Sequence, residues 1–254
     1  MLRRLGLGLI VVVLLLAACD PEPEPPPPPP PTGTVVVYGD SLVVESVAVL
    51  HERFPVFVPN TNLVVRAFGG TAQCDFHDQM TADADELDVV AVVIAFSGNH
   101  ITPCIEDRPY VEGYTADAEW AAALWADHDV PVVFVASLGA LESSVEDQPI
   151  AAVYASVAAA YGAALADPAP LFARGAPSMY ASRMPCLTGE CFGSIEVRRA
   201  DGHLCHEPTA GLPCPDYSSG VTRFVDVMLR AVGQRLDLAE PPPLGAETAV
   251  FRTR

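Results

Sequence analysis

Hydrophobic residues make up 50% of the 254-residue chain, which is enough to build one sizeable domain around a full core. The formal net charge is −18, and the 14 basic residues are all arginine. This composition argues against a nucleic-acid partner, because no basic patch is available to neutralise phosphates.

Residues 1–18 have the features of a signal peptide. Arg3 and Arg4 precede an apolar run that ends at Leu16 and is too short to span a bilayer. The following Ala17-Ala18-Cys19 resembles the box of bacterial lipoproteins, in which the cysteine is acylated after cleavage. Acylation of Cys19 would leave an even number of the seven cysteines for disulfides. We therefore expect an extracytoplasmic, lipid-anchored protein, with an ordinary secretory cleavage site as the alternative.

Residues 19–33 form the expected spacer between this anchor and the folded domain. The unbroken proline run from Pro25 to Pro31 favours an extended, semi-rigid polyproline II conformation that cannot join a core. The domain is then expected over residues 34–238. Residues 239–254, which are again rich in proline, are expected to be a loose tail.

The stretch on which the rest of the interpretation depends begins at Thr34. Its β-branched run predicts a buried strand that stops at Gly39, and the apolar spacing of Val43–Phe54 predicts a helix. Asp40 or Ser41 would cap that helix. The serine hydroxyl is therefore expected at the carboxyl end of a strand and the amino end of a helix, where α/β proteins bind ligands.

Further strands and helices are predicted to alternate along the chain. The predicted strands are Asn62–Phe68, Leu87–Phe96, Val130–Ser137 and Ala163–Asp167, and the predicted helices are Trp120–His128, Ile150–Tyr161 and Ser218–Leu236. Residues 168–199 have no clear periodicity and are expected to be irregular. The alternation predicts an α/β protein with a three-layer α/β/α, flavodoxin-like fold and a mainly parallel five-stranded sheet.

Gly39-Asp40-Ser41-Leu42 is the motif of the GDSL, or SGNH, family of esterases and acyl hydrolases, and two later segments extend this resemblance. Gly70 follows the second predicted strand, where the family has a glycine whose backbone N–H joins the oxyanion hole; Gly69 is the fallback. Asn99 follows the third, where the family has an asparagine that donates its side-chain amide. The resemblance thus implies an oxyanion hole formed by Ser41, Gly70 and Asn99.

The family takes its base from one late segment, in which an aspartate precedes the histidine by three residues. None of the six histidines of this chain has an acid at that distance. Asp201-Gly202-His203-Leu204 resembles the family's motif, but its aspartate precedes the histidine by two residues, one fewer than usual. The resemblance implies Ser41 as nucleophile, His203 as base and Asp201 as the group that orients it, with His206 as a second candidate base. The shorter loop leaves open that a backbone carbonyl orients the ring instead.

The six cysteines after Cys19 are expected to form disulfides between near neighbours, as is common in exported proteins. The expected pairs are Cys74–Cys104, Cys186–Cys191 and Cys205–Cys214. A zinc site is the competing interpretation, because four potential ligands lie close together in the sequence: His203, Cys205, His206 and Cys214.

Together these features predict a serine esterase that acts through an acyl-enzyme on Ser41, as a monomer and without a cofactor or metal. The expected anchor suggests short-acyl or O-acetyl esters on cell-envelope or extracellular carbohydrate as substrates. Two alternatives are open: a weakly active or inactive lipoprotein of the same fold that binds an acylated glycan, and an acyltransferase that uses the same acyl-enzyme.

Overall fold

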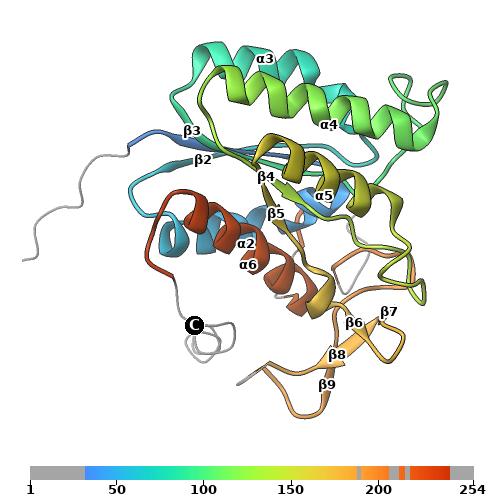
Figure 1. The fold of residues 1–254 in the computed structure, drawn as a ribbon. Coiled ribbons are helices and arrows are strands. Elements are labelled where there is room, and N and C mark those ends of the chain that lie inside the picture. Colours follow the sequence, from blue (N-terminus) through green and yellow to red (C-terminus); the bar gives the residue numbers. More distant parts are fainter. Residues whose placement is uncertain (1–31, 188–189, 206–211, 215–217, 241–254) are drawn as a thin grey trace, which may run out of the picture. The chain divides into compact units, whose positions relative to one another are not determined.

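Five parallel strands form the centre of the fold in the computed structural model, which describes residues 32–187, 190–205, 212–214 and 218–240. Their order across the sheet is β2-β1-β3-β4-β5 (Figure 1). The bounds are Thr34–Gly39 for β1, Asn62–Ala67 for β2, Val89–Ala95 for β3, Val132–Val135 for β4 and Ala164–Ala166 for β5. The predicted five-stranded parallel sheet is confirmed.

The strand β1 lies between β2 and β3 inside this sheet and is buried along its whole length. It pairs in parallel with β2 and β3, so that Val36 lies opposite Val64 on one side and Val92 on the other. Strands covered on both faces can be apolar at every position, which explains the unbroken β-branched run that starts at Thr34. All five strands end at the same edge, and this edge carries the candidate site.

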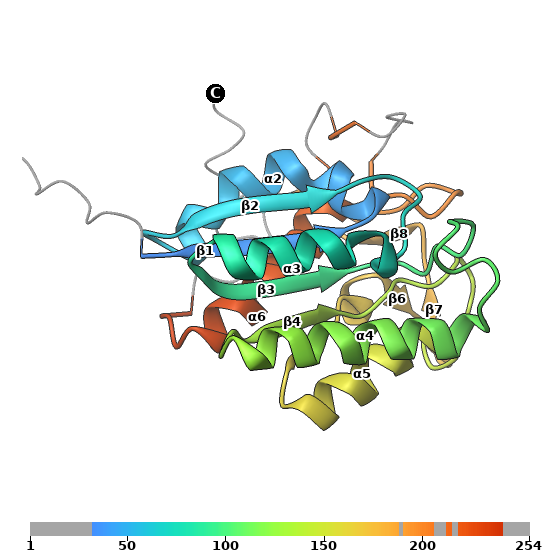
Figure 2. The same ribbon diagram turned by 90° about the horizontal axis from the view of Figure 1, so that it is seen from above.

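Helices cover both faces of the sheet and make the three layers that the sequence predicts (Figures 1 and 2). On one face, α2 and α6 pack against the side chains of Val35 and Val37. On the other, α4 and α5 pack against Val36 and Tyr38, and α3 lies beside α4 (Figure 2). The helices are α2 (Ser41–Phe57), α3 (His77–Glu86), α4 (Tyr110–Asp127), α5 (Pro149–Tyr161) and α6 (Ser219–Arg235).

Two helices differ from the prediction. The helix α4 begins at Tyr110, ten residues before the predicted start at Trp120, because its first turns bury Gly113, Tyr114 and Asp117 rather than a regular apolar stripe. The helix α3 was not predicted at all. Only Met80 and Asp83 of its residues are buried, so its sequence carries almost no apolar periodicity.

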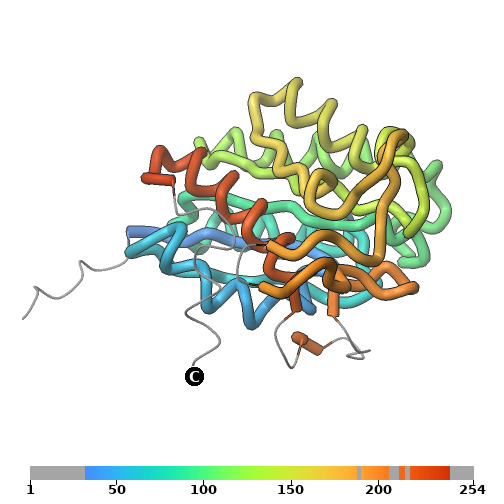
Figure 3. The backbone as a smooth tube through the Cα atoms, turned by 90° about the horizontal axis from the view of Figure 1, so that it is seen from below, coloured from blue at the N-terminus to red at the C-terminus, as the bar shows by residue number. Residues whose placement is uncertain are grey.

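The segment expected to be irregular, residues 168–199, contains two short antiparallel pairs. The strands are β6 (Ala173–Arg174) with β7 (Met179–Tyr180) and β8 (Arg183–Pro185) with β9 (Ser194–Glu196). Figures 1 and 3 show these pairs near the edge where the strands of the sheet end. The segment leads directly into the loop that carries the predicted base.

Several predictions fall on residues outside the described ranges: the signal peptide, acylation of Cys19, the proline spacer, most of the tail and His206 as a base. No helix in the described part of the chain is long and apolar enough to cross a bilayer. The three predicted disulfides, Cys74–Cys104, Cys186–Cys191 and Cys205–Cys214, are all formed. Such bridges are typical of proteins that fold in an oxidising, extracytoplasmic compartment.

Candidate active site

Ser41 lies at the junction between β1 and α2, where the sequence predicts it. Gly39 makes the sharp exit from the strand possible, because a Cβ at this position would lie 2.2 Å from a methyl group of Val43. Asp40 then caps the helix by accepting a hydrogen bond from the backbone N–H of Leu42 at 3.1 Å. The backbone N–H of Ser41 lies at this edge, whereas those of Leu42, Val43 and Val44 donate to the side chain or the carbonyl oxygen of Asp40.

Asp40 also joins the serine loop to the loop after β3. Its Oδ2 accepts hydrogen bonds from the backbone N–H and the hydroxyl of Ser97, both at 2.6 Å, and from the amide of Asn99 at 3.1 Å. The carboxyl group is completely buried, and this burial raises its pKa, while the bonds from Ser97 oppose the rise. Asp40 therefore holds Asn99 in a fixed position relative to Ser41.

The predicted oxyanion-hole residues all lie at this edge. Two of them, Asn99 and Gly70, differ in detail from the prediction. Asn99 lines the same cleft as Ser41, but its amide donates to Asp40 and to the carbonyl oxygen of Thr71, the latter at 3.0 Å. Gly69 is the glycine beside the serine, because its Cβ position would lie 3.9 Å from the Cβ of Ser41. Gly70 has φ +80°, and apart from its two chain neighbours no described residue has an atom within 4 Å of its Cβ position. The roles of these donors remain predictions.

His203 is brought to Ser41 from the far end of the chain. Its Nε2 lies 3.1 Å from the Oγ of Ser41, although 162 residues separate the two. The loop that carries it closes on itself, since the backbone N–H of Arg199 donates to the carbonyl oxygen of His203 at 2.9 Å. Gly202, with φ +86°, makes this tight turn. A hydroxyl and an imidazole at this distance have the geometry that a serine nucleophile and its general base require.

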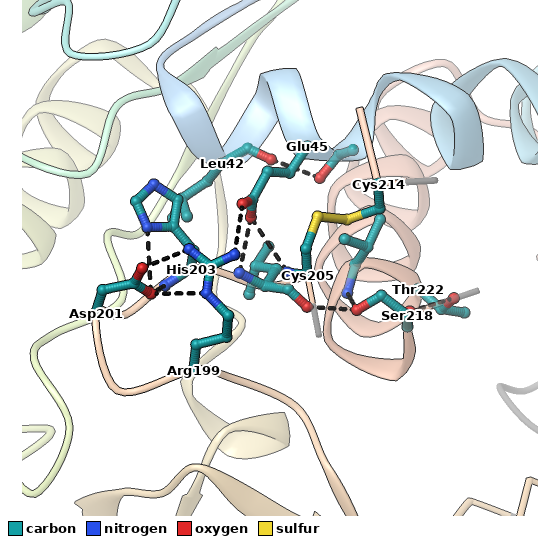
Figure 4. Close-up of a disulfide and its surroundings, with 12 residues drawn as sticks. Leu42, Glu45, Arg199, Asp201, His203, Cys205, Cys214, Ser218 and Thr222 are labelled. Carbon is teal, nitrogen blue, oxygen red and sulfur yellow. Dashed lines mark hydrogen bonds and ion pairs between the residues drawn. A yellow bond between two sulfur atoms is a disulfide. The ribbon is translucent and has the colours of Figure 1, made fainter. Parts of the chain in front are cut away.

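Asp201 lies beside the His203 ring despite the shortened spacing. Its Oδ1 is 3.4 Å from Nδ1, an ion-pair distance, although Nδ1 makes no hydrogen bond to any described residue (Figure 4). The carboxylate also accepts hydrogen bonds from the Arg199 guanidinium and from the backbone N–H of His203. The bond from Arg199 lowers the pKa of Asp201 to about 2. No backbone carbonyl takes its place at Nδ1 within the described residues.

Two residues that sequence reasoning missed hold the histidine loop. Glu45, one turn after Ser41 on α2, is 2% exposed, and its Oε2 accepts from the backbone N–H groups of Leu204 at 2.8 Å and Cys205 at 3.3 Å. Arg199 lies between this carboxylate and that of Asp201 (Figure 4). The sequence does show an acidic residue, Glu45, four positions after the proposed nucleophile. It does not show that this residue contacts the histidine loop.

The disulfide between Cys205 and Cys214 lies on the other side of Glu45 (Figure 4). The backbone N–H of Cys214 donates to the carbonyl oxygen of Glu45 at 3.1 Å, so the bridge is fastened to the serine helix as well. Although the carboxylate and the two sulfurs lie within 4.8 Å of one another, the sulfurs are bonded to each other and offer no thiolate. The zinc interpretation is therefore wrong for these two cysteines.

The serine and the histidine open into one cleft of about 290 Å³. It is lined on one side by the serine and asparagine loops and on the other by the loop after β4 and the histidine loop. Its lining residues are Ser41, Leu42, Ser97, Asn99, Leu138, Ala140, Leu141, Arg198, Ala200, Asp201, Gly202 and His203.

Comparison with known proteins supports the fold. No protein-family model matches the chain, and no curated protein matches it. Among solved structures, a GDSL-like lipase from Bacteroides thetaiotaomicron is similar with a TM-score of 0.51 and 16% identity, over 80% of this chain and 87% of that one. TesA is similar with a TM-score of 0.51 and 16% identity, over 80% and 99% of the two chains.

A protein of the G-D-S-L family from Desulfitobacterium hafniense is similar with a TM-score of 0.50 and 13% identity, over 79% of this chain and 99% of that one. At such identities the likeness concerns the backbone, and it covers nearly the whole of each of these proteins. The chain therefore has the three-layer fold of the GDSL/SGNH hydrolases.

Proposed function

We propose that this protein is a serine esterase of the SGNH type, which hydrolyses carboxylic esters through an acyl-enzyme on Ser41. The observation that carries the proposal is the 3.1 Å distance between Ser41 Oγ and His203 Nε2, two residues that line the cleft. A serine hydroxyl is a poor nucleophile at neutral pH and needs a base at this distance. The fold shared with esterases and lipases of low identity agrees with this chemistry.

In the proposed reaction, Ser41 Oγ attacks the carbonyl carbon of the ester while His203 Nε2 takes its proton. His203 then protonates the leaving alcohol, and the acyl group stays on Ser41. Water, deprotonated by the same imidazole, attacks the acyl carbon and releases the carboxylic acid, which restores Ser41. Asp201 stabilises the imidazolium that forms in each step.

The negative charge on the carbonyl oxygen would be met by the backbone N–H groups of Ser41 and Gly70 and by the Asn99 amide. Each such donor typically stabilises the transition state by about 2.7–4 kcal/mol. Asn99 can contribute by exchanging its bond to the Thr71 carbonyl oxygen for one to the substrate oxygen, while Asp40 keeps the amide in place.

We further propose that the natural substrate is a short-acyl or O-acetyl ester on cell-envelope or extracellular carbohydrate. The lipid anchor expected on Cys19 and the proline spacer after it support this location. A glycan-binding protein without turnover and an acyltransferase are the alternatives, and both would keep the same arrangement of Ser41 and His203.

Labelling with a fluorophosphonate probe tests the proposal, because only an activated serine reacts with it. Peptide mapping should find the label on Ser41, and S41A and H203A should remain unlabelled while circular dichroism shows them folded. Wild-type protein unfolded in guanidinium is the control for unspecific labelling. Failure of the folded wild type to react at Ser41 would show that the domain has no activated nucleophile and favour the glycan-binding alternative.

A further inference from the structure

Arg198 is a buried cation that faces the cleft and has no use in the reaction described above. It lies between β9 and His203, and its side chain is buried with 4% of the residue exposed. It is nevertheless one of the residues that line the cleft of Ser41 and His203. A group in this position can touch the substrate.

Within the described residues, the hydrogen bonds of Arg198 go to neutral groups alone, and Asp201 attracts its charge only from beyond ion-pair distance. Its Nε and Nη2 donate to the carbonyl oxygen of Gly202, at 2.9 and 2.7 Å, and its Nη1 donates to that of Gly139. Asp201 and Glu45, the carboxylates near it, both pair with Arg199 instead. No described carboxylate lies within ion-pair distance of Arg198, and burial lowers its pKa to about 10.

A guanidinium has five N–H donors, and the two carbonyl oxygens engage three of those on Arg198. Burying a cation without a counter-ion is unfavourable unless another interaction compensates for it. The surroundings are also shaped for this side chain: a Cβ on Gly202 would lie 2.8 Å from Nη2. Such a site fits a carboxylate, which accepts charge-assisted hydrogen bonds from the free N–H groups.

We propose that Arg198 binds a carboxylate on the substrate, so that the preferred esters are those of acidic molecules, such as acylated sugars that carry a carboxyl group. The inference rests on the proposed esterase function and names its substrate class. The net charge of −18 works against the approach of any anion, so a preference for acidic esters would have to come from this local contact.

A matched pair of aryl esters tests the proposal. The anionic para-acetoxybenzoate and the neutral para-acetoxybenzamide have nearly the same shape and release the same acetyl group. The meta isomers place the carboxylate or amide at a different distance from the ester, and so test other positions relative to Arg198. Wild-type protein should prefer an acid over its amide. In R198Q the ratio of the two kcat/KM values should fall about 10–100-fold, the effect of losing a hydrogen bond between charged groups. R198K should retain part of the preference.

Arg183 provides the matched control, because it is an exposed arginine of β8 that donates to the carbonyl oxygen of Ser194. R183Q removes the same charge and should leave the ratio unchanged. Equal hydrolysis of acid and amide by the wild type overturns the proposal, as does an R198Q variant that loses both activities equally. If R198Q does not fold, the wild-type ratio decides.

Binding separates this proposal from the proposed function. Calorimetric titration of S41A with para-hydroxybenzoate should show binding that is absent for para-hydroxybenzamide and absent in S41A with R198Q. This result does not require turnover. If Ser41 is not labelled but the acid still binds, the proposed esterase function is wrong and the carboxylate site is supported. If both compounds bind equally, only the proposed carboxylate site is wrong.

Discussion

The carboxylate of Glu45 accepts a hydrogen bond from the backbone N–H of Leu204 at 2.8 Å, and this contact joins the serine helix to the histidine loop. Glu45 lies one turn after Ser41 on α2, and Leu204 follows His203 directly. A single helix therefore carries the nucleophile and fixes the backbone next to the base. This arrangement helps to set the distance between the two groups through the backbone, in addition to the direct contact between Ser41 Oγ and His203 Nε2.

We expect E45A to lower both stability and kcat. It leaves the buried backbone N–H of Leu204 without its acceptor, which costs about 1–3 kcal/mol in the free energy of unfolding. Without this contact, the backbone next to His203 is no longer fixed relative to Ser41. We therefore expect a larger fall in kcat than rise in KM. E45Q, whose amide oxygen can still accept one bond, should be intermediate. Urea unfolding and ester hydrolysis measure the two effects.

The control for Glu45 is Glu52, an exposed residue on the same helix. E52A removes a carboxylate from α2 without touching the histidine loop and should leave both quantities unchanged. Wild-type kcat in a folded E45A protein would show that the loop keeps His203 in place without this contact.

The geometry around Nδ1 of His203 predicts unequal roles for the two residues of the shortened segment. H203A removes the base and should lower kcat by about 10²–10⁴-fold. D201N should lose less, because the carboxylate is 3.4 Å from Nδ1 and is shared with Arg199. Steady-state hydrolysis of para-nitrophenyl acetate by both variants provides the comparison. Equal losses would mean that Asp201 is as necessary as the base, as in a full triad.

The parts of this structure that depend on local pattern could be predicted, and those that depend on distant contacts could not. The strand ending at Gly39 and the helix after it follow from β-branched residues and apolar spacing, and the resemblance added His203. The contact between Glu45 and Leu204 joins residues 159 positions apart, and no local pattern records it. The same holds for Arg198, whose burial in the cleft depends on the loop after β4.

The low pKa of Asp201 predicts a defined pH dependence of stability. The pKa falls from 3.8 to about 2 on folding, mainly because of the hydrogen bond from Arg199. Between these values the unfolded chain binds more protons than the folded one, so the contribution is present above pH 3.8 and is lost as the pH falls toward 2. The contribution of Asp201 to the free energy of unfolding is small, since its carboxylate is half exposed.

Urea unfolding of wild type and D201N across this range measures the effect. The wild type should be the more stable protein at neutral pH, and the difference should disappear at the acid end. D127N, which changes an exposed aspartate at the end of α4, should follow the wild type throughout. A difference between wild type and D201N that stays constant with pH would argue against ionisation of Asp201 as its source.

Gly202 offers a test that separates backbone strain from the position of Arg198. Its φ is +86°, and that of Gly193, in the β8–β9 turn, is +88°, so alanine at either position costs about 1–2 kcal/mol in backbone strain. At Gly202 the new Cβ would also lie 2.8 Å from Arg198 Nη2, while at Gly193 no atom of another described residue lies within 4 Å, its two chain neighbours aside. We expect G202A and G193A to be destabilised to a similar extent in urea, because the end of the arginine side chain can move aside. Only G202A should then lower the preference for para-acetoxybenzoate over its amide, since only there is the guanidinium displaced. An unchanged preference in a folded G202A protein would show that the carboxylate contact tolerates movement of Arg198 and depends on another group.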